Sequence, residues 1–196
     1  VGSEMCIRDR FKAQNMSNNS MVCPDGAEIG RAQYLQATAA GVVPQASMNP
    51  VLLKPGTDRR SFIVLMGQAA GELEAGEYAT GRRQLAEAAF DCYSSLAASH
   101  ELVVCEGAGS PAEINLRSGD YVNMGLARHF GLPTVLVGDI DRGGVLAGLY
   151  GTWALLGEED RALLRGYVIN KFRGDRALLE PGLQEITRRT SMPCFG

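Results

Sequence analysis

Three short apolar runs, each followed by a polar loop that contains glycine, constrain the fold of this chain most. They lie at residues 102–105, 134–137 and 166–169, and stretches of helical composition such as residues 121–130 and 145–156 separate them. Continuous apolar runs that alternate with helices are typical of a parallel sheet with helices on both faces. Ligands of such sheets bind at the carboxyl ends of the strands. The sequence therefore predicts an α/β fold with a ligand site in these loops.

The first half of the chain is less regular. Residues 27–40 and 77–98 have helical composition, and residues 61–66 are typical of a strand. Lys54-Pro55-Gly56 predicts a turn, because proline and glycine interrupt regular structure. No internal repeat or linker is visible, so we expect one domain.

The composition disfavours several classes of function. The net charge is −3, whereas a nucleic-acid-binding protein needs a clustered basic face. The five cysteines form no CxxC pair and the two histidines have no partner at ligand spacing, so neither a disulfide framework nor a zinc site is expected. No apolar run reaches the ~18 residues that span a bilayer. We expect a cytoplasmic protein without a nucleic-acid or membrane partner.

The loop after the first apolar run, Glu106-Gly107-Ala108-Gly109, is the strongest local feature. A carboxylate at the end of a buried strand suits Mg²⁺, which prefers one or two carboxylates together with water and phosphate oxygens. Glycines such as Gly107 and Gly109 let the main chain approach a nucleotide closely. A glycine-rich turn whose glutamate caps the next segment fits the pattern equally well.

The loop at residues 139–144 contains two aspartates beside an arginine. Asp139 and Asp141 could organise a metal, a nucleotide or a carboxylate substrate, and Arg142 offers a planar fork for carboxylate or phosphate. The alternative is an aspartate that caps the following helix, with a surface ion pair beside it. Capping needs only one of these residues, so the full cluster modestly favours a function.

Lys12 lies in a polar stretch at residues 11–20 that is rich in asparagine and serine. Such side chains both donate and accept hydrogen bonds, so they suit a ligand-binding surface, although a solvated loop would have a similar composition. The chain contains no GxxxxGK[ST] phosphate-binding motif. It also has no cysteine on a glycine-flanked strand-to-helix turn with a histidine partner, so no thiol nucleophile is predicted.

These loops resemble the glutamine-dependent cobyric acid synthases, and the resemblance extends from Phe11 to Gly196. The segments that carry it are FKAQNMSNNS (11–20), DGAEIGRAQYLQA (25–37), MNPVLLKP (48–55), VVCEGAGSPAEINLR (103–117), NMGLA (123–127), VLVGDIDRGGV (135–145), INKFRGD (169–175) and LLEPGL (178–183). The resemblance implies the dethiobiotin synthetase-like P-loop NTPase fold, with a parallel sheet between helices.

The resemblance also implies a reaction. Members of this family use ATP to amidate the b, d, e and g carboxylates of adenosylcobyrinic acid a,c-diamide, which gives adenosylcobyric acid. ATP and Mg²⁺ are the implied cofactors, and a glutaminase domain supplies ammonia from glutamine. A carboxylate is a poor electrophile, so ATP would convert it into an acyl phosphate that ammonia displaces. Catalysis of such a transfer is mostly positioning and charge neutralisation.

Particular residues match the family's functional positions. Lys12 matches a lysine that contacts phosphate and the reacting carboxylate, and we take it as catalytic. Asp139 and Asp141 are the other catalytic candidates. Glu28 and Glu106 match Mg²⁺ ligands.

The nucleotide and the corrinoid have further candidates. Asn170 matches the residue that reads adenine, and we expect Lys171, Gly107 and Gly109 to contact the nucleotide too. The substrate-binding candidates are Asn15, Ser17, Asn18, Asn19, Asn115, Arg117 and Arg142.

The chain departs from the family pattern in three respects. Residues 1–10, VGSEMCIRDR, resemble a translated adapter, so we treat residues 11–196 as a partial amide-forming domain. The phosphate-binding strand and loop are not found, and neither is the glutaminase domain. We therefore expect a fragment that is inactive alone, and a homodimer is left open. The alternatives are a dethiobiotin synthetase-like ligase and a partitioning-type ATPase switch.

Overall fold

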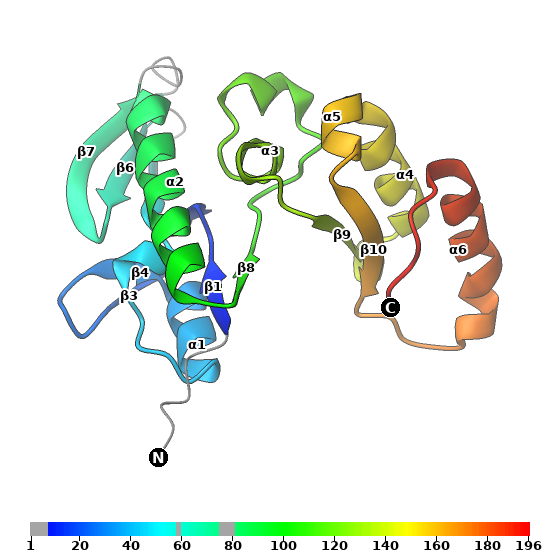
Figure 1. The fold of residues 1–196 in the computed structure, drawn as a ribbon, viewed down its shortest axis with the longest axis horizontal. Helices are drawn as coiled ribbons and strands as arrows, with labels where there is room; N and C mark the ends of the chain where they lie inside the picture. The colour runs from blue at the N-terminus through cyan, green and yellow to red at the C-terminus, as the bar shows by residue number, and fades with distance from the viewer. Residues whose placement is uncertain (1–7, 58–59, 75–80) are drawn as a thin grey trace. The chain divides into compact units, whose positions relative to one another are not determined.

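The computed structural model describes residues 8–57, 60–74 and 81–196, which form two compact units (Figure 1). Unit 1 comprises residues 1–109 and 121–123, and unit 2 comprises residues 110–120 and 124–196. Buried hydrophobic clusters lie within each unit. The two units therefore divide the predicted strands between them.

A pair of parallel strands positions the first candidate residues of unit 1. Strand β1 (Arg8–Phe11) pairs with β8 (Leu102–Cys105), with Phe11 opposite Cys105. Residues 8–10 belong to the segment that we expected to be non-native, yet they pair because the ladder uses main-chain groups. The rest of that segment lies outside the described residues.

A second sheet of unit 1 has four strands. Their order is β2 (Gln14–Met16), β5 (Val51–Thr57), β6 (Arg60–Leu65) and β7 (Gln68–Glu74). Strand β2 is parallel to β5, and the other pairs are antiparallel. The predicted turn at residues 54–56 is wrong, because these residues belong to β5. A register shift between Pro55 and Thr57 accommodates the proline and glycine there.

A hairpin and the helices complete unit 1. Their bounds are β3 (Ser20–Val22), β4 (Glu28–Gly30), α1 (Arg31–Ala39), η1 (Ala46–Met48) and α2 (Gly81–Ser99). The helix expected at residues 27–40 begins only at Arg31, because residues 28–30 pair with residues 20–22. Residues 77–80 of the second expected helix lie outside the described residues.

Unit 2 is built on the parallel pair β9 (Thr134–Asp139) and β10 (Leu164–Asn170), in which Asp139 lies opposite Asn170. The helices of this unit are η2 (Ile114–Gly119), α3 (Met124–Phe130), η3 (Ile140–Arg142), α4 (Val145–Leu155), α5 (Glu158–Arg161) and α6 (Arg176–Thr190). The strands match the predicted runs at residues 134–137 and 166–169, and each is slightly longer.

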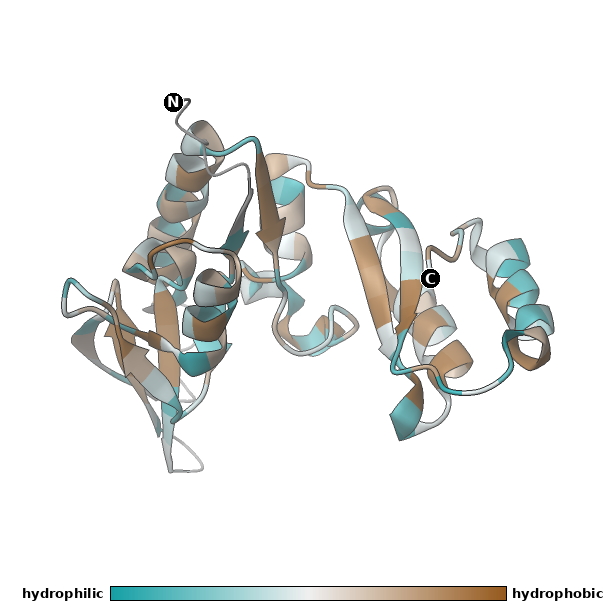
Figure 2. Ribbon diagram, turned by 90° about the horizontal axis from the view of Figure 1, so that it is seen from below, coloured by the Kyte–Doolittle hydropathy of each residue, from teal (hydrophilic) through white to brown (hydrophobic). Residues whose placement is uncertain are grey.

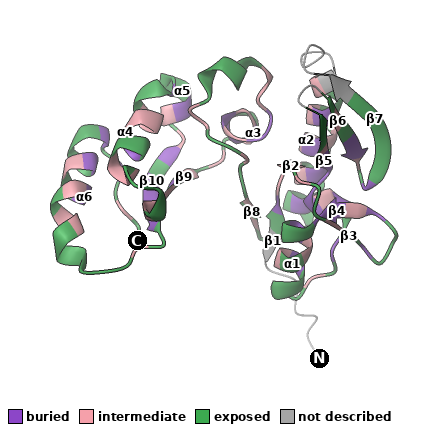
Figure 3. Cartoon of the chain, turned by 180° about the vertical axis from the view of Figure 1, so that it is seen from behind, coloured by how far each residue is buried: buried purple, intermediate pink, exposed green. Residues whose placement is uncertain are grey.

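The core of unit 2 forms between the strands and one face of each long helix. Tyr167 of β10 is fully buried, and its hydroxyl donates to the Leu183 carbonyl of α6 at 3.1 Å. Along α6 the buried residues Leu183, Ile186 and Thr190 recur at helical spacing, while most of the helix is exposed (Figure 3). Apolar residues run along the strands (Figure 2).

The predicted α/β class is confirmed by the two parallel pairs, β1–β8 and β9–β10, and by the helices that alternate with strands. Among the described residues, no helix combines the length and apolar character needed to cross a membrane.

Candidate functional site

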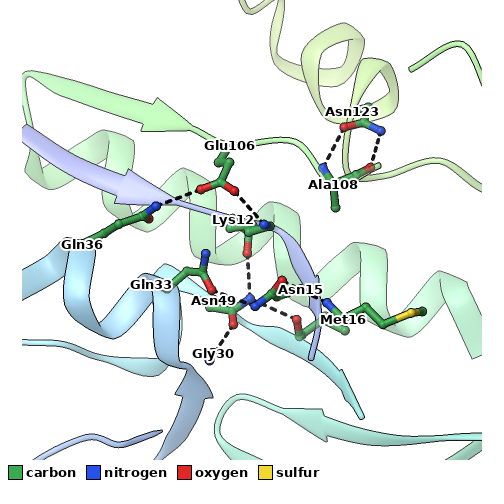
Figure 4. Close-up of polar contacts among 11 residues, drawn as sticks. Lys12, Asn15, Met16, Gly30, Gln33, Gln36, Asn49, Glu106, Ala108 and Asn123 are labelled. Carbon is green, nitrogen blue, oxygen red and sulfur yellow. Dashed lines mark hydrogen bonds and ion pairs between the residues drawn. The ribbon is translucent and has the colours of Figure 1, made fainter. Parts of the chain in front are cut away.

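The pairing of β1 with β8 brings Lys12 and Glu106 together, because each residue directly follows its strand. The Lys12 Nζ lies 2.7 Å from Glu106 Oε1 (Figure 4). The Glu106 main-chain N–H donates to the Phe11 carbonyl at 2.8 Å. The Gln36 Nε2 of α1 donates to the other carboxylate oxygen of Glu106, at 3.0 Å. Both oxygens of the predicted metal ligand therefore have a protein partner.

The environment of Glu106 keeps its carboxylate ionised. Burial raises the pKa of Glu106, but hydrogen bonds from Lys12 and Gln36 and the charge of Lys12 outweigh it and hold the pKa below the usual value. The Glu106 side chain is 47% exposed, whereas that of Lys12 is 12% exposed. An ionised and accessible carboxylate fits Mg²⁺, which takes few protein ligands and keeps water and phosphate oxygens.

The second predicted metal ligand, Glu28, has different partners. Its Oε1 accepts hydrogen bonds from the Ser20 hydroxyl and the Lys54 ammonium. Burial raises the pKa of Glu28. These two hydrogen bonds and the charge of Lys54 lower it by more, so the pKa lies below its usual value and Glu28 too is ionised. The structure thus places Glu28 in a separate ion pair. Lys54 was not among the predicted residues, because its partner is 26 positions away in the sequence.

The glycine loop after β8 takes its shape from Asn123. The Ala108 N–H donates to Asn123 Oδ1 at 3.0 Å, and Asn123 Nδ2 donates to the Ala108 carbonyl at 2.8 Å. A Cβ on Gly107 would lie 2.2 Å from Asn123 Oδ1, so only glycine fits there. Gly109 has a φ of +68°, which also favours glycine. Asn123 was not among the predicted residues.

The four substrate-loop candidates in residues 15–19 differ in accessibility. Asn15 is engaged at both ends, since its Oδ1 accepts the Met16 N–H and its Nδ2 donates to Gln33 Oε1, each at 3.0 Å. The Ser17 hydroxyl accepts the Asn19 N–H at 3.0 Å. Asn18 and Asn19 have exposed side chains. The Asn18 Nδ2 donates to the Pro55 carbonyl at 3.4 Å, yet both side chains remain an exposed polar surface, as the sequence predicted for this loop.

In unit 2 the aspartate loop follows β9 directly. Asp139 accepts the Asp141 N–H at 3.0 Å and so caps the short helix η3, whereas the residue before α4 is Gly144 and not a capping aspartate. Lys171 Nζ lies 2.8 Å from Asp139 Oδ2, and this hydrogen bond is the main reason that the pKa of Asp139 is lowered. Arg142 Nε lies 3.8 Å from the same oxygen. Asn170 Oδ1 accepts the Lys171 N–H at 2.9 Å. These five candidates are therefore brought together.

The remaining candidates, Asn115 and Arg117, lie on η2 of unit 2. Asn115 is exposed. The Arg117 guanidinium instead makes two hydrogen bonds to the buried Asp160 carboxylate, Nε to Oδ2 at 2.9 Å and Nη2 to Oδ1 at 2.7 Å. These bonds are the main cause of the raised pKa of Arg117. Arg117 thus has a structural partner that its local sequence does not reveal.

One known protein family matches nearly the whole of this chain. The CobQ/CobB/MinD/ParA nucleotide binding domain family matches residues 10–196. A cobyric acid synthase from Cutibacterium acnes is 77% identical over 186 residues, which cover 95% of this chain and 38% of that relative. Proteins of the same name from Mycobacterium tuberculosis and Mycobacterium bovis are 63% identical over 190 residues, with the same coverage.

The chain thus spans 38% of the length of these relatives. No solved structure matches it. The resemblance seen in the loops is confirmed by relatives that carry the name cobyric acid synthase along nearly the whole chain. The chain belongs to the family of CobQ/CobB/MinD/ParA nucleotide binding domains.

Proposed function

We propose that the chain is the ATP-dependent amide-forming segment of a cobyric acid synthase. Its substrate would be adenosylcobyrinic acid a,c-diamide, amidated at the b, d, e and g carboxylates with ammonia that a glutaminase releases from glutamine. The relatives of that name support the substrate class. The observation that carries the proposal is the Lys12–Glu106 pair at the carboxyl ends of β1 and β8.

Lys12 and Glu106 have complementary roles in the proposed chemistry. The ammonium of Lys12 would neutralise negative charge on the reacting carboxylate and on the transferred phosphoryl group. Glu106 would hold the Mg²⁺ that accompanies ATP, and bound Mg²⁺ supplies charge neutralisation at the phosphates. Glu28 remains a proposed second carboxylate. The glycines of the loop shaped by Asn123 would let the main chain approach the nucleotide.

The loops of unit 2 carry the remaining candidates. We propose that Asn170 and Lys171 contact the nucleotide, and that Asp139, Asp141 and Arg142 act at the substrate. Their support is the shared position after β9 and β10, where ligands of parallel sheets bind. The exposed asparagines of the substrate loop, Asn18 and Asn19, and Asn115 of η2 would contact the corrinoid.

A chimaera tests this proposal. Residues 11–196 replace the matching segment of the Cutibacterium acnes relative, and the corrinoid diamide is incubated with ATP, Mg²⁺ and either ammonia or glutamine. We expect the corrinoid to be amidated in steps, and mass spectrometry of the products measures each added amide. Lys12→Met and Glu106→Gln should each lower kcat about 100-fold or more, because each removes a charge aimed at the reacting groups. Glu87→Gln, an exposed carboxylate of α2, is the matched control.

Two outcomes would contradict the proposal. One is a folded chimaera that makes no amide while the parent enzyme does. The other is a Lys12→Met variant as fast as the unsubstituted chimaera. ATP hydrolysis without any amide product would instead favour the ATPase switch.

A further inference from the structure

The main chain of Lys12 has no strand partner, because Lys12 lies between β1, which ends at Phe11, and β2, which begins at Gln14. Two other residues make hydrogen bonds to its main-chain N–H and carbonyl. The Lys12 N–H donates to the Met48 carbonyl at 2.9 Å, and the Lys12 carbonyl accepts from Asn49 Nδ2 at 3.0 Å. Met48, the last residue of η1, and Asn49, which follows it, therefore hold both main-chain groups of Lys12.

Asn49 is only 1% exposed, and its whole amide is used. Besides Lys12, its Nδ2 donates to the Val51 carbonyl at 3.1 Å, and its Oδ1 accepts the Gly30 N–H at 3.0 Å. The Gly30 N–H can only donate, so the amide oxygen must face Gly30 and the NH₂ group must face Lys12. A buried amide is costly unless such bonds are made, so its orientation is well determined.

Gly30 fits this arrangement because it has no side chain. A Cβ at Gly30 would lie 2.4 Å from Asn15 Nδ2, 2.5 Å from Gln33 Oε1 and 3.1 Å from Asn49 Oδ1. We call these three side chains the amide junction; they meet over the start of α1 (Figure 4). Helix α1 also carries Gln36, which holds Glu106. The junction therefore fixes Lys12 relative to the helix that holds its partner.

We propose that Asn49 is a positioning residue that aligns Lys12 for the reaction, an inference that rests on the function proposed above. Asn49 contacts the main chain of Lys12, whereas the Lys12 ammonium faces Glu106. Loss of the Asn49 donor would misplace the ammonium without removing it. A misplacement of about 1 Å in a catalytic group can cost about 100-fold in rate.

The test is a double-mutant cycle in the chimaera with Asn49→Asp and Lys12→Met. Asn49→Asp keeps the size and the acceptor for Gly30 but removes both donors. We expect kcat to fall about 10–100-fold with little change in KM, because alignment in the transition state is lost. In the Lys12→Met background the same change should lower kcat less than about 2-fold, since residues that act as a unit are not additive.

The control is Thr190→Val in unit 2. Valine is similar in size to threonine, so this change removes a buried hydroxyl of α6 without changing the volume much. It should lower the melting temperature without changing kcat. If Asn49→Asp does not fold, Asn49→Ser takes its place, because it introduces no charge and is too short to reach the Lys12 carbonyl. The same pattern is expected, and an unchanged kcat would overturn the inference.

The outcomes separate the two proposals. If the unsubstituted chimaera forms no amide, the proposed function fails before the cycle is read. If it is active but the Asn49 and Lys12 effects multiply, Asn49 acts independently of Lys12 and the inference fails.

Discussion

Gln33 shows how single hydrogen bonds orient a chain of amides. The Met16 N–H must donate, so it fixes the Asn15 oxygen, and the Asn15 nitrogen must then donate to Gln33 Oε1. The Gln33 side chain is buried, and its Nε2 makes no hydrogen bond within the described part of the chain. That nitrogen is therefore a buried donor, and its orientation is set through Asn15 by the main-chain N–H of Met16.

The closeness of the amide junction to Gly30 leads to a stability prediction. Gly30→Ala should destabilise the protein by about 1–3 kcal/mol, because the added methyl must displace two side chains that lie within 2.5 Å. Gly148→Ala in α4 is the matched control, since a Cβ there meets nothing within 4 Å. It should be neutral or stabilise by up to about 1 kcal/mol.

Urea unfolding of the two glycine variants measures both effects. Equal stability of Gly30→Ala and the unsubstituted chain would mean that the junction can relax at no cost.

The sequence offered Lys12 and Glu106 as candidates, but it did not point to the residues that hold them. Gln36, Asn49 and Asn123 are ordinary amides whose partners lie 15 to 70 positions away. Local pattern carries no information on such pairs, because they depend on which strands meet. A faint signal existed at Gln36, which lies three residues after Gln33 and thus on the same face of α1.

At the scale of elements, α5 and η2 are joined by the Arg117–Asp160 pair. Asp160→Asn should destabilise the protein by about 1.5–3 kcal/mol, because it weakens two charge-assisted hydrogen bonds to a carboxylate that is 6% exposed. Glu159→Gln is the matched control on the same helix. Its carboxylate is 73% exposed and pairs with Arg128, so its loss should cost under about 1 kcal/mol.

Thermal unfolding of the Asp160 and Glu159 variants under one buffer condition checks this difference. A Glu159→Gln change as costly as Asp160→Asn would show that burial does not set the strength of these pairs.

Element boundaries were predicted best for the continuous apolar runs. The run at residues 102–105 forms β8 without any change of bounds. Strand β5 was missed because Pro55 and Gly56 suggest a turn, and only pairing with β6 makes the irregular strand favourable. The start of α1 was placed too early because residues 28–30 have a helical composition but are recruited into a hairpin.

For the whole molecule, four carboxylates lead to a prediction on pH. Glu28, Glu106, Asp139 and Glu185 have pKa values below their usual ones, and that of Glu185 is lowered to about 2 by Arg188 and Arg189. A folded pKa below the unfolded one means that the unfolded chain binds more protons as pH falls. Their stabilisation is therefore present above pH 4.5, the ordinary glutamate value, and is lost on acidification below it.

Urea midpoints measured between about pH 3 and 7 at constant temperature check this dependence. The midpoint should fall steeply below pH 4.5 and Glu106→Gln should make the fall shallower. In about 1 M NaCl the Debye length is about 3 Å. The salt should therefore reduce the stabilisation that comes from exposed ion pairs, such as those of Glu185. A midpoint that rises on acidification would contradict the assignment.

The division into units has a consequence for the connectivity of the chain. The polypeptide passes from one unit to the other after Gly109, returns after Asp120, and leaves again after Asn123. The short return is anchored, since the buried Tyr121 hydroxyl donates to Gln14 and Asn123 holds the loop at Ala108. A single proteolytic cut therefore cannot separate the two units cleanly, because either fragment keeps a piece that belongs to the other.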